Sequence, residues 1–335
     1  MNERVAPTAM RAIVVAETGG LDALRLATVP VPEARPGWVR IKVKAFGVNE
    51  SEVTTRKGES DGEVTYPRIP GIEGVGVVDW APEGSGLRSG QQVATMMGGM
   101  GRAFDGSYAQ YMVVPVGQVI PFETSLPWDV VGAVPEMFQT AYGSLKAALD
   151  LQAGQTLLIR GGTSTVGLSA ATMAKDLGAT VIATTRDAGR AGELRAMGVD
   201  HPIVDDGKIA EKVRAIVPDG VDAALELVGC SVLPDTLGCV RVYGTVCFTG
   251  ALAGAWTLPD FSPFMIPTGV RLTSYAGGAT DLPAPVLQQQ LQAIADGRLK
   301  VPVAKVYYGL EQVRDAQAGV EAGTTPGKHV VLLDD

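Results

Sequence analysis

The residues best suited to chemistry form a short run of small side chains between two apolar segments. Residues 157–167 read Leu-Leu-Ile-Arg-Gly-Gly-Thr-Ser-Thr-Val-Gly. This order predicts a strand, a tight turn and the start of a helix. Such a turn lets backbone N–H groups approach a pyrophosphate, and the helix N-terminus adds a favourable field. We therefore predict a dinucleotide site whose phosphate-binding residues are Gly162, Thr163, Ser164, Thr165 and Val166.

The glycine pattern departs from the common G-x-G-x-x-G, because it reads Gly162-x-Ser164-x-x-Gly167. Two other glycine-loop chemistries are excluded by single residues. A Walker A loop needs Lys after Gly167, where Leu168 stands, and a nucleophile elbow needs Gly where Val166 stands. A tight turn without a ligand is the remaining alternative.

The segment after the next predicted strand, residues 180–185, indicates which nucleotide is bound. An acidic residue there binds the ribose 2′-hydroxyl of NAD, whereas Arg accommodates the 2′-phosphate of NADP. Here Thr185 and Arg186 end the strand, and Arg190 follows one helical turn later. This arrangement favours NADPH. Asp187 is the counter-argument, although it also suits the N-cap of the next helix. The alternative is that the two arginines are simply solvated.

Composition and charge exclude several classes of function. The 335 residues are 46% hydrophobic and 19% charged, which suffices for a sizeable core. The net charge of −8, without a basic stripe, makes nucleic acid an improbable partner. The chain has no apolar run long enough to span a bilayer and no apolar signal core in its first ten residues. Three cysteines do not make a disulfide framework, so we expect a cytoplasmic protein.

The elements that must position this loop change in character along the chain. The first third alternates short β-type runs with turn residues, at 11–15, 39–48, 75–80, 92–95 and 108–114. A long Ala-rich helix is predicted over residues 128–150. Strands and helices then alternate from 156 to 250, which indicates a parallel sheet with right-handed crossovers. After about residue 270 we expect strands at 271–275, 303–307 and 328–332, and helices at 283–296 and 311–322.

Six short motifs recur at family-like spacing along nearly the whole chain: Ala45-Phe-Gly-Val-Asn49, Pro70-Gly-Ile-Glu-Gly-Val-Gly76, Gly106-Ser-Tyr-Ala-Gln-Tyr111, Gly161–Gly167, Glu226-Leu-Val-Gly229 and Gly327-Lys-His-Val330. In this order the chain resembles the medium-chain dehydrogenase/reductase superfamily, and within it the zinc-free, NADPH-dependent quinone oxidoreductase branch. The resemblance implies an α/β protein with a GroES-like β-barrel catalytic domain and a Rossmann doubly wound parallel-sheet domain. We place the barrel domain at residues 1–127, the dinucleotide-binding domain at 128–269 and the return to the barrel at 270–335.

The resemblance also implies further site residues. Substrate is expected in the cleft between the two domains. Asn49, Thr140, Val228, Phe248 and Thr249 should line the nicotinamide end of the cofactor site. Tyr275, where the chain returns to the barrel, is expected to approach the cleft. Asn49 and Tyr275 are therefore the catalytic candidates, with substrate positioning as their role.

The departures from the zinc-dependent relatives predict that no metal is bound. Those relatives place Cys where this chain has Asn49, and His where it has Ile72, just before Glu73. The four-cysteine structural zinc lobe is missing, and zinc needs three or four clustered ligands. Many quinone reductases also carry tyrosines where this chain has Phe46 and Thr54, so no tyrosine proton donor carries over at those positions.

Two of these residues, Asn49 and Glu73, have a structural role as the alternative to a role in the active site. Asn49 could instead cap a helix at residues 50–56. Glu73 is expected to form a structural ion pair, with an arginine as its expected partner.

The sequence therefore predicts an NADPH-dependent reductase of quinones or α,β-unsaturated carbonyls. An enoyl-thioester reductase and a non-catalytic NADPH-binding sensor or structural protein are the alternatives. We also expect a homodimer formed through an apolar edge strand around residues 245–250, and no membrane partner.

Overall fold

The computed structural model describes residues 7–60 and 62–334 and divides the chain into two compact units. Unit 1 comprises residues up to Glu136, together with 278–295 and 303 onward, and unit 2 comprises residues 137–277 and 296–302. The first segment of unit 1 ends at residue 136, where the sequence predicted 127, and the chain returns to unit 1 after residue 277, where the sequence predicted 269. The strand at residues 271–274 accordingly lies in unit 2.

Unit 1 is built on a seven-stranded sheet. Its order is β14-β15-β3-β4-β5-β7, and β6 pairs with β3. The strands are β3 (Trp38–Val48), β4 (Glu73–Trp80), β5 (Gln92–Met96), β6 (Tyr111–Pro115), β7 (Ile120–Pro121), β14 (Val303–Tyr308) and β15 (Lys328–Leu332). Along the first half of β3, buried and half-buried residues alternate, as the sequence predicted. The alternation puts one face of the strand into the core.

Smaller elements complete unit 1. A two-stranded antiparallel sheet pairs β1 (Ala9–Val15) with β2 (Leu24–Pro30). The helices are α1 (Glu50–Lys57), α2 (Trp128–Val131), α8 (Ala284–Ala295) and α9 (Val313–Ala322). Residues of β1, β3, β6, α9 and β15 share one hydrophobic core.

Unit 2 contains a parallel six-stranded sheet in the order β10-β9-β8-β11-β12-β13. The strands are β8 (Thr156–Arg160), β9 (Thr180–Thr185), β10 (His201–Val204), β11 (Val221–Glu226), β12 (Val240–Phe248) and β13 (Arg271–Ser274). The helices are α4 (Thr165–Leu177), α5 (Ala191–Ala196), α6 (Ala210–Ile216) and α7 (Leu233–Gly238). This is the parallel sheet predicted from the alternation of strands and helices, in the doubly wound form that the family resemblance implied.

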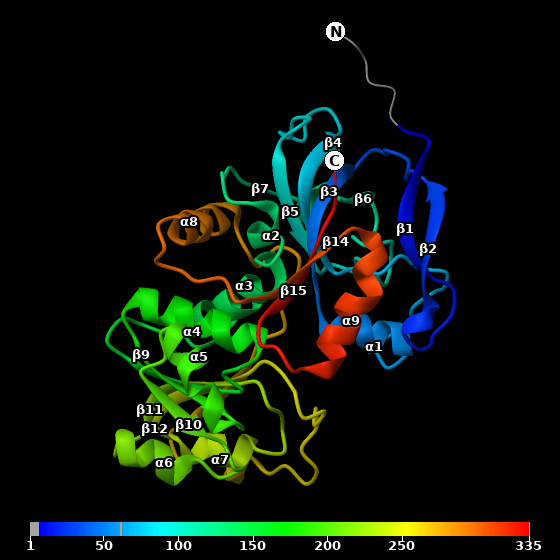
Figure 1. Cartoon of the computed structure of the whole chain (residues 1–335). Coiled ribbons are helices and arrows are strands. Elements are labelled where there is room, and N and C mark those ends of the chain that lie inside the picture. Colours follow the sequence, from blue (N-terminus) through cyan, green and yellow to red (C-terminus); the bar gives the residue numbers. More distant parts are fainter. Residues whose placement is uncertain (1–6, 61, 335) are drawn as a thin grey trace. The chain divides into compact units, whose positions relative to one another are not determined.

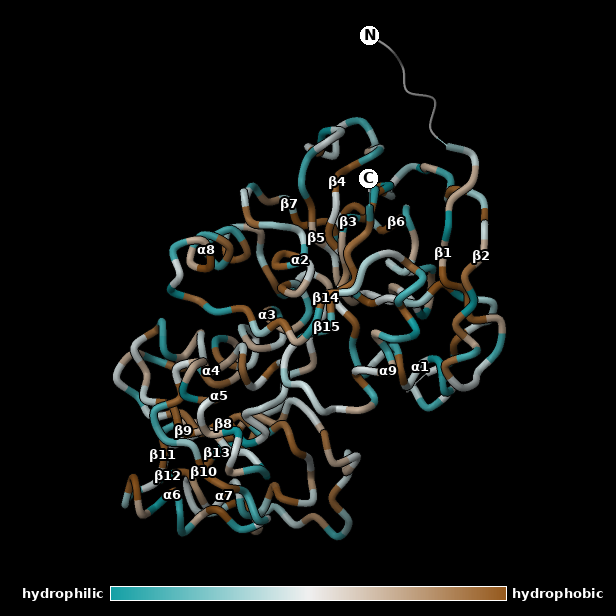
Figure 2. Tube along the Cα trace, in the orientation of Figure 1, coloured by the Kyte–Doolittle hydropathy of each residue, from teal (hydrophilic) through white to brown (hydrophobic). Residues whose placement is uncertain are grey.

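Both faces of this sheet are buried, as parallel sheets require. Leu157 and Ile159 of β8 face a core that includes α4 and α5, whereas Leu158 between them faces a core that includes α6 and α7. Figure 1 shows these two pairs of helices on opposite faces, and Figure 2 shows hydrophobic residues along the strands. The fold class predicted from the sequence is confirmed.

Two local expectations were wrong. The helix expected over residues 128–150 is broken into α2, α3 (Pro135–Tyr142) and a π-helical segment, Gly143–Ala148. Gly132 ends α2, and Pro135, which lacks an N–H, suits only the first turn of a new helix. The strand expected at the sheet edge is β12, yet it pairs with β11 and β13, so β13 ends the sheet.

Within residues 7–60 and 62–334, no helix is long and apolar enough to cross a membrane.

Candidate functional site

The predicted phosphate-binding turn lies directly after β8 and has the tight packing that glycines permit. Gly161 has a φ of +90°, a conformation that side-chain-bearing residues rarely adopt. A Cβ on Gly162 would lie 2.8 Å from the Cβ of Ala183 on β9, and one on Gly167 would lie 2.5 Å from the carbonyl oxygen of Gly161. The first turn of α4 therefore packs closely on the sheet, which leaves its N–H groups directed beyond the strand end.

Ser164, which replaces the middle glycine of the common motif, is the N-cap of α4. Its hydroxyl donates to the carbonyl of Gly161 at 2.8 Å and accepts from the N–H of Gly167 at 3.1 Å. The serine thus stabilises the turn that the glycine pattern builds in other chains. Thr163, Thr165 and Val166 lie half-buried around it, where the sequence predicted the pyrophosphate.

The predicted 2′-phosphate residues follow β9, the neighbour of β8 in the sheet. Thr185 is buried, and its hydroxyl bonds the backbone of Asp187. Asp187 accepts the N–H of Gly189 at 2.8 Å, so it caps the following turn, as the sequence suggested. Arg186 is exposed, and Arg190, half-buried, lies 3.7 Å from the carboxylate of Glu193. Both cations therefore stand at the carboxyl end of β9.

The other predicted cofactor residues follow β11 and β12. Glu226 ends β11 and accepts the N–H groups of Val228 at 2.6 Å and Gly229 at 3.0 Å, which fixes that turn. Burial raises the pKa of Glu226, although these bonds oppose the shift. Phe248 ends β12, and the Thr249 hydroxyl lies 2.9 Å from Oγ of Ser144. Because the strands are parallel, their carboxyl ends meet at one edge, where such sheets bind ligands.

Two of the predicted residues share a hydrogen-bonded group in unit 2. The buried Gln139 donates from Nε2 to the Tyr275 hydroxyl at 2.9 Å, and its Oε1 accepts from the Thr140 hydroxyl at 3.2 Å. Tyr275 also needs Gly143, because a Cβ there would lie 1.9 Å from its ring. Sequence reasoning missed Gln139 and Ser144, and the adjacency of Gln139 to Thr140 in an apolar helix was the available signal.

A buried arginine that the sequence reasoning overlooked ends β8. Arg160 is fully buried and binds Asp205 through Nε at 2.9 Å and Nη2 at 3.0 Å. Its Nη1 donates to Asp235 at 2.8 Å and to the Thr236 hydroxyl at 2.9 Å. Since Arg160 immediately precedes Gly161, this group holds the strand from which the glycine turn starts.

Asn49, the remaining predicted residue, lies in unit 1 within a buried charge cluster. This cluster consists of Asn49, Glu52, Glu73, Glu136 and Lys328. Asn49 caps α1, and its backbone N–H donates to Glu52 at 2.9 Å, which supports the structural alternative. Its Nδ2 donates to Oε1 of Glu73 at 3.0 Å, and its Oδ1 accepts from Lys328. The polar groups of Asn49 are thus engaged inside the cluster.

The ion-pair partner of Glu73 is Lys328, not an arginine as expected. The ammonium lies 3.0 Å from Oε1 of Glu73 and 2.8 Å from Oε2 of Glu136. The other oxygen of Glu73 accepts the backbone N–H of Glu136 at 2.8 Å. Burial raises the pKa of Glu73, and the Lys328 charge opposes that shift. Burial likewise raises the pKa of Glu52 to about 7, against the N–H bond from Ile72.

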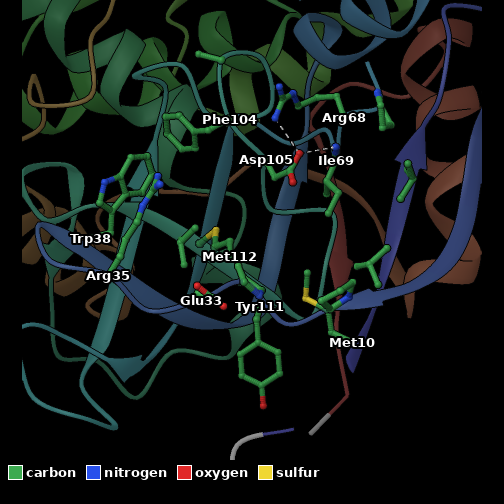
Figure 3. A pocket seen from close by; sticks show the side chains of 17 residues that line it. Met10, Glu33, Arg35, Trp38, Arg68, Ile69, Phe104, Asp105, Tyr111 and Met112 are labelled. Atoms are coloured by element: carbon green, nitrogen blue, oxygen red, sulfur yellow. Dashed lines mark hydrogen bonds and ion pairs between the residues drawn. The ribbon is translucent and has the colours of Figure 1, made fainter. Parts of the chain in front are cut away.

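A cavity of about 530 Å³ in unit 1 lies apart from both groups. Met10 and Val29 line it from β1 and β2, and Tyr111 lines it from β6. Figure 3 shows Arg68 paired with Asp105 at its rim. None of the predicted site residues lines this cavity, so it is not the candidate active site.

Comparison with known proteins gives matches over both units. The family model of the alcohol dehydrogenase GroES-like domain matches residues 35–124, and that of the zinc-binding dehydrogenases matches residues 197–331. The human synaptic vesicle membrane protein VAT-1 homolog is 26% identical, covering 97% of this chain and 86% of its own length. The probable quinone oxidoreductase of Leishmania amazonensis is also 26% identical, covering 90% and 91%. The structure of mycobacterial Rv1454c complexed with NADPH has a TM-score of 0.82 at 27% identity, covering 96% of this chain and 99% of that one.

The GroES-like unit, the parallel six-stranded sheet and the glycine turn define an α/β oxidoreductase with a dinucleotide-binding fold. The chain belongs to the medium-chain dehydrogenase/reductase superfamily.

The zinc in the description of one matching family does not fit the residues of this chain. Among the described residues, no group of three or more His, Cys, Asp or Glu side chains is arranged to hold a metal ion. Where the side-chain oxygens of Asn49, Glu73 and Glu136 converge, the Lys328 ammonium already stands.

Proposed function

We propose that this protein is an NADPH-dependent, zinc-independent reductase that transfers hydride to quinones or to α,β-unsaturated carbonyls. The observation that carries the proposal is the placement of Arg186 and Arg190 at the end of β9, beside the glycine turn that ends β8. The names of two similar proteins support it, since one is a probable quinone oxidoreductase and the other was solved with NADPH.

The residues of this chain fit such a cofactor. The N–H groups of Thr163, Thr165 and Val166 would bind the pyrophosphate, because those of Gly162 and Ser164 already donate to the carbonyls of Thr184 and Gly161. The two arginines would bind the 2′-phosphate. Thr140, Val228, Phe248 and Thr249 would line the nicotinamide end. Bound NADPH supplies the hydride, so the protein's task is to orient the acceptor and exclude water. A quinone can take its proton from solvent, and no dedicated acid is needed.

Cofactor choice is tested with the double variant Arg186→Ala/Arg190→Ala. A charge-assisted bond to phosphate is worth about 1.5–3 kcal/mol, so NADPH binding should weaken about tenfold or more while NADH binding changes little. Arg195→Ala, an exposed arginine on α5, is the matched control. Equal losses for both cofactors would refute the assignment.

Substrate class is tested by following NADPH oxidation with quinones, enones and enoyl thioesters. Turnover of quinones or enones supports the proposal. Exclusive turnover of enoyl thioesters would show that the protein is an enoyl-thioester reductase instead. Intact NADPH binding without turnover of any acceptor would leave a non-catalytic binding protein.

Positioning rather than acid catalysis is expected at the two catalytic candidates. Asn49→Ala and Tyr275→Phe should each lower turnover only partially, whereas loss of a general acid typically costs about 10²–10⁴-fold. The Tyr275 hydroxyl already accepts a hydrogen bond from Gln139. Abolished turnover in Tyr275→Phe with NADPH binding intact would identify a dedicated donor instead.

We also propose a cytoplasmic homodimer, now through β13 rather than β12. β13 ends the described sheet, and the nearby segment 250–270, yellow in Figure 1, exposes Trp256 and Phe264. Light scattering should give twice the chain mass at micromolar concentration, and Phe264→Arg should shift it towards monomer. A wild-type monomer would rule the dimer out.

A further inference from the structure

Lys328 stands where oxygen atoms from three other segments of unit 1 converge. Asn49 precedes α1, Glu73 begins β4, and Glu136 lies in the first turn of α3. The ammonium bonds the side chain of each, at 3.0 Å from Glu73 and 2.8 Å from Glu136. An ammonium has three N–H donors, so these three acceptors match its full capacity.

The environment of this ammonium is that of a bound ion rather than of a surface lysine. Only 1% of the Lys328 side chain is exposed, and Glu73 is fully buried. Desolvated charges are retained only where partners compensate them closely. Here carboxylate and amide oxygens surround a single positive centre, which is how proteins also hold hard metal cations.

The same arrangement explains why a metal does not fit. A cation placed among the oxygens of Asn49, Glu73 and Glu136 would occupy the volume of the ammonium. It would also face like-charge repulsion at contact distance. The atom that prevents metal binding among these oxygens is therefore Nζ of Lys328.

We propose that the Lys328 ammonium is a built-in cation that replaces a metal ion in unit 1 and acts as a positioning residue for Asn49 and Glu136. It fixes the Asn49 amide with Oδ1 towards the ammonium and Nδ2 towards Glu73. It also ties the first turn of α3 to the start of β15. This proposal about Lys328 is compatible with the proposed zinc-free reduction. Its tests measure ion binding and melting temperature rather than turnover, so this proposal and the proposed function can fail independently of each other.

The first test compares two variants that lack the ammonium. Lys328→Ala leaves space for a replacement ion, whereas Lys328→Met fills that space. Lys328→Ala should bind about one Mn²⁺ per chain, since carboxylate and amide oxygens suit Mn²⁺, seen as loss of the free-ion electron paramagnetic resonance signal. Wild type and the volume-conserving Lys328→Met should not bind it. Lys328→Ala/Glu73→Gln should bind it more weakly than Lys328→Ala, because one ligand charge is gone. Lys305→Ala, an exposed lysine on β14, is the matched control.

The second test restores the ammonium from solution. Ethylammonium should raise the melting temperature of Lys328→Ala but not that of wild type, Lys328→Met or Lys305→Ala. Tetramethylammonium, which has no N–H donor, should not. If only the aliphatic stem of the lysine mattered, ethylammonium and tetramethylammonium would have the same effect on the melting temperature of Lys328→Ala.

The proposal is supported if Lys328→Ala selectively binds Mn²⁺ or is selectively stabilised by ethylammonium. It is overturned if neither result is obtained, or if wild type itself binds Mn²⁺ in a manner lost in Glu73→Gln. Should Lys328→Ala fail to fold alone, refolding it with each ion gives the answer. Recovery with Mn²⁺ or ethylammonium supports the proposal, and failure with both overturns it.

Discussion

Each unit contains a buried cation that pairs with two carboxylates, Arg160 in unit 2 and Lys328 in unit 1, and the two cations differ in how they bind their partners. In unit 2, the Arg160 guanidinium binds Asp205 through two nitrogens and reaches Asp235 with a third. In unit 1, the Lys328 ammonium is shared between Glu73 and Glu136. A planar guanidinium matches a carboxylate with two parallel bonds, whereas an ammonium acts as a point charge.

The carboxyl groups respond differently in the two clusters. Burial raises the pKa of Asp205, but the bonds from Arg160 and Gly207 outweigh it, so the net pKa is lowered. In unit 1, burial dominates, and the pKa values of Glu52 and Glu73 are raised. The Arg160–Asp205 pair therefore stays ionised and anchors the end of β8, from which the glycine turn starts. The unit 1 cluster has more acidic groups than its single cation neutralises, and one can hold a proton near neutral pH.

The largest effect should come from Arg160→Met. Removing one partner of a buried ion pair costs about 3–5 kcal/mol, because Asp205 and Asp235 lose the charge that compensates their burial. Urea unfolding should show the loss, and NADPH binding should weaken because the glycine turn begins at the next residue. A cost below about 1 kcal/mol, the value of an exposed pair, would contradict this anchoring role.

Lys328→Met should destabilise less, by about 1–3 kcal/mol, because Glu73 can take up a proton in place of the lost cation. Loss of the lysine charge raises the pKa of Glu73 further. A raised folded-state pKa means stability that is lost as pH rises, so the cost of this variant should grow with increasing pH. A pH-independent cost would argue that packing alone is responsible.

Glu52 should make the stability of unit 1 depend on pH. Its pKa is raised from 4.5 to about 7, so the folded state holds the proton more tightly than the unfolded state. The resulting stabilisation is complete below 4.5 and is lost as pH rises through about 7. In Glu52→Gln, the fall in unfolding free energy between about pH 5 and about pH 7 should shrink by about 1–2 kcal/mol. Parallel pH profiles for variant and wild type would refute this.

The smallest effect is expected outside both clusters, at the Arg241–Asp222 pair. Its Nε–Oδ1 distance is 2.7 Å, but 39% of the arginine side chain is exposed. Arg241→Ala should cost at most about 1 kcal/mol and lose even that at high salt. This variant gives the loss of unfolding free energy expected for an exposed ion pair. A loss as large as that of Arg160→Met would contradict the stronger contribution of the buried pairs.

Much of unit 2 could be predicted from the sequence because its signals are local. The order strand, glycine turn and helix over residues 156–177 is set by neighbouring residues, and it is confirmed. The N-cap role of Asp187 depends on a residue two positions away, and the sequence also suggested it. The roles of the predicted cofactor residues stay predictions.

The errors arose where a local pattern met a non-local constraint. The Ala-rich spacing of residues 128–150 reads as one helix, but Gly132 and Pro135 divide it. The apolar residues of β12 suggested an edge strand, yet β13 covers that edge. Whether an apolar strand is central or terminal depends on which strand pairs next, and the hydrophobic pattern of that strand alone does not encode it.

The sequence by itself determined the alternating strands and helices of unit 2 and the glycine turn, because periodicity and turn chemistry act over a few residues. Only the tertiary structure decided the partner of Glu73. Lys328 lies 255 residues away from Glu73 and 279 from Asn49, and β15 brings it there by pairing with β3. A buried charge needs a partner wherever the topology supplies one, so its identity follows from the completed sheet rather than from neighbouring residues.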